Sequence, residues 1–332
     1  MIELDPLIDM GALRDVAGDV DLGGFHLRHP TLDGSGVKVA VLDGGIDTRH
    51  PFLNVSLDRT RNVTGEGLEV PSLHATHCAG VIASTHAQFS GIAPGVELFN
   101  IKATLANRLG SPGLTSLGID RARDVGARIL SISLGTNHIP LDLGGDGWPC
   151  AQGLCLICDA VDTAAAHGHL VVVAAGNEHV DIEHIQDAGG DVPSEIRCPG
   201  QARGALTVGA LKKTTFMVLD ESSRGPTADD RPKPDLWATG VGVVSTTPVP
   251  PGVVPGGPGG IPDGLLFGAL TGTSVATPMV AGALALVIQR RAAAGLDTSR
   301  EAVLEELFAH GVEPLVEGAG LPTLTRLTLH AL

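Results

Sequence analysis

Short apolar runs alternate with stretches of helical periodicity through most of the chain. The first run, residues 37–42, follows Gly34-Ser35-Gly36 and is rich in β-branched side chains, as a buried strand would be. Helices are predicted from His74 onward and near residues 114–125 and 154–167. Apolar strands separated by helices indicate an α/β fold, in which a mostly parallel central sheet carries helices on both faces. The further buried strands are predicted at 96–101, 128–133, 170–175, 205–209 and 241–245.

Two more helices are predicted near the C-terminus. The first covers residues 274–294 and stops at Gly295. The second opens with the capping-box pattern Thr298-Ser299-Arg300-Glu301 and ends at Gly311.

Two glycine- and proline-rich insertions interrupt this pattern, at residues 136–153 and 246–264. Neither resembles a linker between domains, because sheet-forming segments continue on both sides of each. We therefore predict one domain over residues 34–332, preceded by an N-terminal extension over residues 1–33.

The charge balance narrows the choice of partners. The 332 residues contain 22 Lys and Arg against 37 Asp and Glu, a net charge of −15, so phosphate backbones and anionic membranes should repel the chain. Aromatic residues make up only 3%, which disfavours stacking on nucleic-acid bases. The longest apolar run, residues 276–288, is too short for a membrane span, and the N-terminus lacks the features of a signal peptide. We expect a cytoplasmic protein with no nucleic-acid or membrane partner.

Of the five cysteines, Cys150, Cys155 and Cys158 lie close together in the sequence. A zinc site would need a fourth ligand, and neither His138 nor a second C-x2-C pair gives a known spacing. A local disulfide, which Cys198 could join, and reduced buried thiols are the alternatives. The sequence therefore predicts no metal.

Asp43 is the first candidate for catalysis. In an open parallel sheet, functional groups gather at the carboxyl ends of the strands, and Asp43 ends the first predicted strand. The glycines that follow let the backbone turn, so this carboxylate is well placed to orient a base. An Asp in such a turn can also be purely structural.

His74 and His77 share one face of a predicted helix, with Cys78 next in the sequence. Such a pair could hold a metal, but no carboxylate or third histidine follows at metalloprotease spacing. The other interpretation is a general base, in which a carboxylate such as Asp43 fixes the second ring nitrogen of His74.

Ser274 stands at the start of the long apolar helix. A serine in this position is commonly an N-cap, yet the positive helix end also favours negative charge that develops beside a nucleophile. The chain order Asp43, His74, Ser274 is one of the known orders of a catalytic triad.

Seven segments resemble, in order, the motifs of subtilisin-like serine proteases. The resemblance implies a three-layer subtilisin-like α/β sandwich and a serine endopeptidase that uses no cofactor and acts on a peptide or protein substrate. The segments are 39–47 with His50-Pro51, 74–80, Gly91-Ile92-Ala93-Pro94, Ser133-Leu134-Gly135, Ala174-Ala175-Gly176-Asn177, 222–226 and 272–282.

The resemblance also implies a role for each site residue. Asp43 would orient the base His74, and Ser274 would be the nucleophile. The side-chain amide of Asn177 and the backbone N–H of Ser274 would stabilise the oxyanion. The implied substrate-binding residues, beside which a peptide would add as an extended strand, are Ser133, Leu134, Gly135, Ala175 and Gly176.

Several departures from the family pattern leave every catalytic group in place. Gly44 stands where Ser or Thr is usual, and Ala75 stands where Gly is usual. Phe52 occupies a position at which many relatives carry a calcium-ligating Asp, so that calcium site is predicted to be lost. The 33 residues before Gly34 are expected to be too few for the usual inhibitory prodomain.

The leading functional prediction is a serine endopeptidase. A dedicated form of it would remove leader segments from a modified peptide, which the lack of an export signal and of a prodomain favours over general digestion. The alternative is a catalytically silent peptide-binding protein on the same scaffold.

Overall fold

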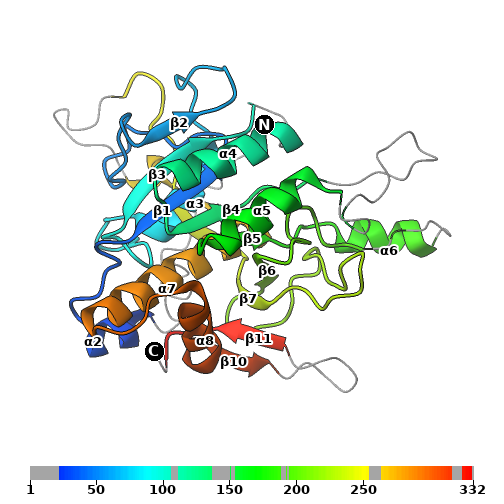
Figure 1. Ribbon diagram of the computed structural model, residues 1–332. Helices are drawn as coiled ribbons and strands as arrows, with labels where there is room; N and C mark the ends of the chain where they lie inside the picture. The colour runs from blue at the N-terminus through cyan, green and yellow to red at the C-terminus, as the bar shows by residue number, and fades with distance from the viewer. Residues whose placement is uncertain are drawn as a thin grey trace.

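A computed structural model describes residues 22–105, 111–136, 150, 154–187, 192, 194–253, 263–315 and 324–330. A nine-stranded sheet forms its centre (Figure 1). Its strands are β1 (Lys38–Asp43), β2 (Thr60–Asn62), β3 (Glu97–Lys102), β4 (Ile129–Ile132), β5 (Leu170–Ala174), β6 (Ala205–Leu211), β7 (Leu236–Thr239), β10 (Val312–Leu315) and β11 (Leu324–Leu327).

The strand order is β10-β11-β7-β6-β5-β4-β1-β3-β2. Neighbouring strands pair in parallel, and β10 with β11 is the antiparallel exception. The central strands are buried along nearly their whole length, since helices cover both faces.

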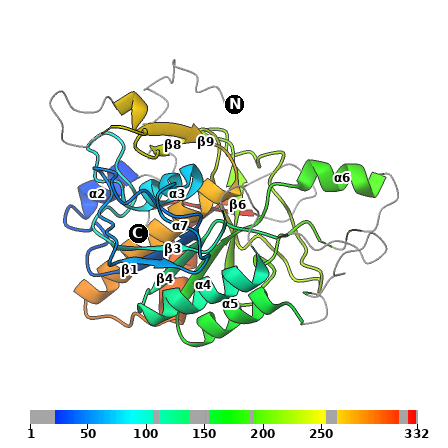
Figure 2. The ribbon, with the colours of Figure 1, turned by 90° about the horizontal axis from the view of Figure 1, so that it is seen from above.

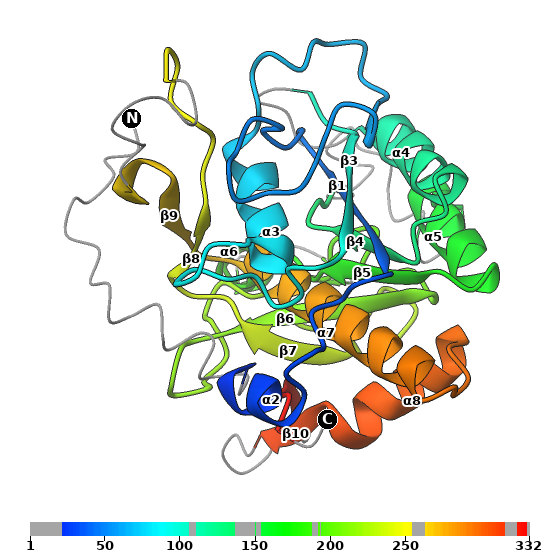
Figure 3. The ribbon, with the colours of Figure 1, turned by 90° about the vertical axis from the view of Figure 1, so that its left-hand side faces the viewer.

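The helices form one layer on each side of the sheet. In the view from above, α4 and α5 lie on one face, and α3 and α7 lie on the other (Figure 2). Helix α8 packs beside α7 (Figure 3). The bounds are α2 (Leu22–Arg28), α3 (Leu73–Ala83), α4 (Pro112–Asp124), α5 (Leu156–Ala166), α6 (His179–Asp187), α7 (Thr273–Ala293) and α8 (Arg300–His310). The predicted α/β sandwich is confirmed.

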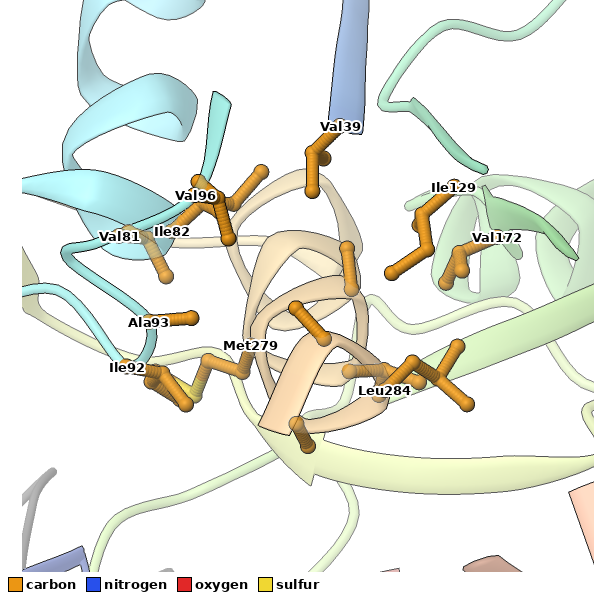
Figure 4. Close-up of a cluster of buried hydrophobic side chains, with 14 of the residues drawn as sticks. Val39, Val81, Ile82, Ile92, Ala93, Val96, Ile129, Val172, Met279 and Leu284 are labelled. Carbon is orange, nitrogen blue, oxygen red and sulfur yellow. The ribbon is translucent and has the colours of Figure 1, made fainter. Parts of the chain in front are cut away.

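Helix α7 runs through the middle of the larger hydrophobic core. Side chains of β1, β4 and β5, such as Val39, Ile129 and Val172, surround it together with side chains of α3 (Figure 4). Among the described residues, α7 is the one helix with the length and hydropathy of a membrane span, and 83% of that stretch is buried inside the protein. Its apolar composition is therefore explained by contact with the sheet and with α3.

The strand predicted at 241–245 lies outside the central sheet. It is β8 (Val243–Thr246), which pairs antiparallel with β9 (Phe267–Leu270) in a separate two-stranded sheet beyond α3 (Figures 2 and 3). Gly80 of α3 allows this close packing, because a Cβ there would lie 2.2 Å from Thr246 Oγ1. The strand that follows β6 in the central sheet is β7, which was not among the predicted strands.

Other predictions match in position or lie outside the described residues. The helix predicted to open with a capping box begins at Arg300, and Ser299 caps it by accepting a hydrogen bond from the Ala302 backbone, one residue later than expected. Most of the predicted insertion 136–153 lies outside the described residues, as does the extension before Leu22.

Candidate active site

The candidate residues meet at one edge of the sheet. Strands β1, β4 and β5 are neighbours and run in parallel, so their carboxyl ends share that edge. Asp43 ends β1, Ser133 follows β4, and Asn177 follows β5 after Ala175 and Gly176. The N-terminus of α7 reaches the same place, because Thr273 Oγ1 hydrogen-bonds with the backbone of Gly176.

Asp43 and His74 form a short hydrogen bond, 2.6 Å between Asp43 Oδ2 and His74 Nδ1. The second carboxylate oxygen, Oδ1, accepts the backbone N–H of Gly44 at 2.6 Å. The carboxylate is buried, and its charge raises the pKa of His74 above the ordinary histidine value, although desolvation opposes that shift. With Nδ1 held by Asp43, the Nε2 atom of His74 is the nitrogen available for proton transfer.

Gly44 explains how α3 begins so close to Asp43. A Cβ at position 44 would lie 2.9 Å from the Cβ of Ser72, the residue that caps α3. Ser72 in turn donates its backbone N–H to Gly45 at 2.8 Å. The departure at position 44 therefore leaves space for the helix that carries His74.

Ser274 is positioned through its backbone carbonyl. That carbonyl accepts Ser133 Oγ at 2.7 Å and Cys78 Sγ at 3.3 Å. Cys78 lies one turn after His74 on α3, and its sulfur is within 4.8 Å of ligand atoms of both Asp43 and His74. Helix α3 thus brings the Asp–His pair to the start of α7. Burial raises the pKa of the Cys78 thiol, so the thiol stays protonated and donates its hydrogen bond to the Ser274 carbonyl.

Ser274 is the second residue of α7, so its backbone N–H has no helical acceptor within the first turn. Gly272 precedes the helix with φ 140°, a backbone conformation that L side chains rarely adopt. The turn therefore presents the first N–H groups of α7 and its positive end at the sheet edge.

Asn177 is exposed beside the start of α7. Its Oδ1 accepts the backbone N–H of Thr273 at 2.8 Å. This contact uses the oxygen of the side-chain amide and fixes its orientation, so both N–H bonds of Nδ2 are directed elsewhere. Such a neutral donor can stabilise a developing oxyanion without competing for the proton.

The segments after β4 and β5 enclose an ion pair that the motif analysis missed. Arg197 Nε lies 2.6 Å from Glu178 Oε2, and both side chains are largely buried. A Cβ at Gly176 would lie 2.5 Å from Arg197 Cγ, and a Cβ at Gly135 would lie 2.9 Å from Arg197 Cβ. Arg197 therefore packs against both predicted substrate-binding segments. No motif in the sequence marks this ion pair.

His77 is not part of the same group. Its Nε2 atom lies 2.8 Å from the carbonyl of Val243 and 3.1 Å from that of Gly268, so the side chain joins α3 to β8 and β9. Complete burial lowers its pKa to about 4. The interpretation of His74 and His77 as a metal-binding pair is therefore not supported by their orientations.

Phe52 lies in an aromatic cluster with His86 and Phe267. Its ring contacts those of His86 and Phe267, with centroids 4.5 Å and 5.9 Å away. The side chain at this position therefore serves apolar packing, and the loss of the family's calcium site stays a prediction.

Comparison with known proteins gives the family. The profile of the Subtilase family matches residues 34–315, and the chain therefore belongs to that family of serine proteases. It is 32% identical over 308 residues to the Intracellular serine protease of Paenibacillus polymyxa, covering 88% of this chain and 80% of that one. It is 31% identical over 340 residues to Serine protease AprX of Bacillus subtilis (strain 168), covering 94% and 71%.

The solved structure of Prenylagaramide maturation protease PagA has the same fold. The TM-score is 0.63 over 89% of each chain, at 23% sequence identity. Family membership makes the chain a hydrolase, a subtilisin-like serine protease whose substrates are peptides or proteins.

Proposed function

We propose that the chain hydrolyses peptide bonds by an Asp43–His74–Ser274 triad. In this mechanism Ser274 Oγ attacks the substrate carbonyl carbon while His74 Nε2 accepts the hydroxyl proton. The protonated imidazole then gives that proton to the leaving amine, and water releases the acyl group by the same route. The observation that carries the proposal is the 2.6 Å hydrogen bond between Asp43 and His74, on a helix that contacts the carbonyl of Ser274 through Cys78.

The negative charge of the tetrahedral intermediate needs donors that are already in place. We assign this role to Asn177 Nδ2 and to the backbone N–H of Ser274. The contact of Asn177 Oδ1 with the Thr273 backbone supports the assignment, because it orients the amide before the substrate arrives.

The substrate backbone would lie between the segments after β4 and β5. The proposed binding residues are Ser133, Leu134 and Gly135 on one side, and Ala175 and Gly176 on the other. An extended peptide there would add as a strand, so its main chain supplies affinity and its side chains supply selectivity.

A fluorophosphonate probe tests the nucleophile directly. The probe should label Ser274 in the folded protein and no serine after heat denaturation. Ser274→Ala should abolish labelling and lower turnover by about 10⁶, without a change in melting temperature. Labelling of a different serine, or turnover in the alanine variant close to that of the wild type, would refute the triad. Labelling also separates an active enzyme from a catalytically silent binding protein.

The narrower role remains the removal of leader segments from a modified peptide in the cytoplasm. The name of the Paenibacillus polymyxa relative, Intracellular serine protease, supports the location. The maturation protease PagA, as its name describes it, is consistent with the role, but 23% identity carries the fold alone. The test of this role compares the cleavage rate of leader-bearing precursor peptides with that of an unfolded protein such as casein. Equal rates on both substrates would favour general digestion.

A further inference from the structure

Four cysteine side chains converge on one point next to the substrate-binding segments. Cys155 Sγ lies 2.9 Å from Cys198 Sγ, Cys158 Sγ lies 3.4 Å from Cys198 Sγ, and Cys150 Sγ lies 3.6 Å from Cys158 Sγ. All four sulfur atoms lie within 4.8 Å of one another. Cys155, Cys158 and Cys198 are buried, and Cys150 is partly buried.

Three separate parts of the chain bring these sulfurs together. Cys155 is the N-cap of α5, Cys158 lies in the first turn of the same helix, and Cys150 lies just before it. Cys198 comes from the segment that leads to β6, 43 residues after Cys155. The fourth ligand that a search by spacing could not find is therefore supplied by the fold.

We propose that Cys150, Cys155, Cys158 and Cys198 form a structural zinc site. A Zn–S bond of about 2.3 Å places the four sulfurs of a tetrahedral site about 3.8 Å apart. The three closest pairs here are 2.9, 3.4 and 3.6 Å apart, and all pairs lie within 4.8 Å, so small side-chain movements would admit the ion. Two disulfides would join Cys155 to Cys198 and Cys150 to Cys158. Cys158 Sγ, however, lies closer to Cys198 Sγ, at 3.4 Å, than to Cys150 Sγ, at 3.6 Å, so the four sulfurs form one group and not two separate pairs.

The electrostatic surroundings favour a cation at the centre of the cluster. Zinc replaces the four thiol protons, which pass to solvent, and reduces a charge of −4 on four thiolates to −2. The N-terminus of α5 directs its positive end at Cys155 and Cys158.

The arginines that line a neighbouring cavity of about 210 Å³ do not add a large net positive charge near the thiolates. Arg203 and Arg231 line it, but both pair with Asp229, and Asp159 and Asp162 line it as well. Zinc and the helix end therefore provide most of the compensation for the thiolates.

The proposed zinc site lies next to both proposed substrate-binding segments. The carbonyl of Cys198 accepts the backbone N–H of Thr136 at 2.8 Å, directly after the segment Ser133-Leu134-Gly135. The preceding residue, Arg197, donates its backbone N–H to Ala175 at 2.8 Å. A zinc ion that fixes Cys198 to α5 thus fixes the segment between the two substrate-binding segments.

Metal content tests the proposal independently of catalysis. The full chain is produced in zinc-supplemented medium, purified in reductant without chelator, and analysed by inductively coupled plasma mass spectrometry. We expect one zinc per chain. Replacement by Co²⁺ should give the strong thiolate charge-transfer absorption and the visible bands of tetrahedral cobalt bound by four sulfurs.

Matched cysteine variants locate the metal. Cys198→Ser and Cys155→Ser should reduce the zinc content to background, while Cys78→Ser, which changes the cysteine outside the cluster, should retain one zinc. If a cluster variant does not fold, the cobalt spectrum of the wild type still decides, because its intensity depends on the number of thiolate ligands. Zinc-free protein with intact thiols, or a mass lowered by four hydrogens from two disulfides, would overturn the proposal.

Discussion

Two substitutions of Asn177 distinguish the structural contact of its Oδ1 from the proposed oxyanion contact of its Nδ2. Its Oδ1 accepts the backbone N–H of Thr273 at 2.8 Å, and its Nδ2 is the proposed oxyanion donor. Asn177→Ala removes both, whereas Asn177→Asp keeps the acceptor and loses the donor. If Asn177 only positions the turn, the aspartate variant should behave like the wild type. If it stabilises the oxyanion, the aspartate variant should be at least as impaired as the alanine variant, since a carboxylate repels the developing charge.

The expected size follows from the surroundings of the amide. A hydrogen bond to a charged acceptor is worth about 1.5–3 kcal/mol, and an oxyanion donor in a water-excluded site about 2.7–4 kcal/mol. Asn177 is exposed in the free enzyme, so water can replace its contact with Thr273 in the alanine variant at small cost. We therefore expect Asn177→Ala to lower kcat by about 10² to 10³, the range that loss of one such donor gives in this enzyme family.

The assay is steady-state hydrolysis of a chromogenic peptide, with kcat and KM determined separately for each variant. The amide contacts the substrate oxygen only as charge develops, so the loss should appear in kcat with KM nearly unchanged. Melting temperatures provide the control for folding. A loss confined to KM, or an aspartate variant with near wild-type kcat, would refute the role of Asn177 as a donor.

Three further predictions follow from the described contacts. Asp43→Asn removes the charge that raises the pKa of His74, so the acid limb of kcat/KM should move to lower pH while kcat falls about 10⁴-fold; an acid limb that does not move would contradict this pairing. Arg197→Ala removes the side chain that packs against Gly135 and Gly176, so a peptide library should show a shift toward larger side chains at the adjoining substrate position. An unchanged profile would show that Arg197 does not affect substrate selection. The folded form of His77, with its pKa of about 4, binds fewer protons than the unfolded form, so stability is lost as pH falls from 6.5 toward 4, by roughly 3 kcal/mol in all. His77→Gln should flatten that part of the curve in denaturant titrations, and a curve of unchanged slope would count against the assignment.

The sequence predicted the parts of the fold that local pattern determines. The strands from 37–42 to 205–209 and the long helix at 274–294 all have buried apolar runs, and each lies within a few residues of its predicted position. The placement of β8 could not be predicted in this way, because its apolar run is like that of a central strand. Its separate pairing depends on contacts with Gly80 and His77, which are distant in the sequence.

The same distinction holds for the candidate site: residues in local motifs could be predicted, and contacts between distant segments could not. The residues of the proposed triad stand in long local motifs, so the sequence alone identifies them as candidates. Arg197 and the carbonyl contacts of Ser274 have no motif, because each depends on the meeting of segments far apart in the chain. The cysteine cluster shows the same limit, since spacing alone left its fourth member unassigned.

The position of Ser274 at the head of α7 has a consequence for biosynthesis. Residues 43 and 74 are synthesised about 200 residues before residue 274. Helix α7 packs against β4, β5, β6 and β7 at once, so it cannot settle until those strands have assembled. A nascent or truncated chain thus carries the Asp–His pair without the proposed nucleophile. In the proposed mechanism, peptide hydrolysis can therefore begin only after the sheet and α7 have assembled.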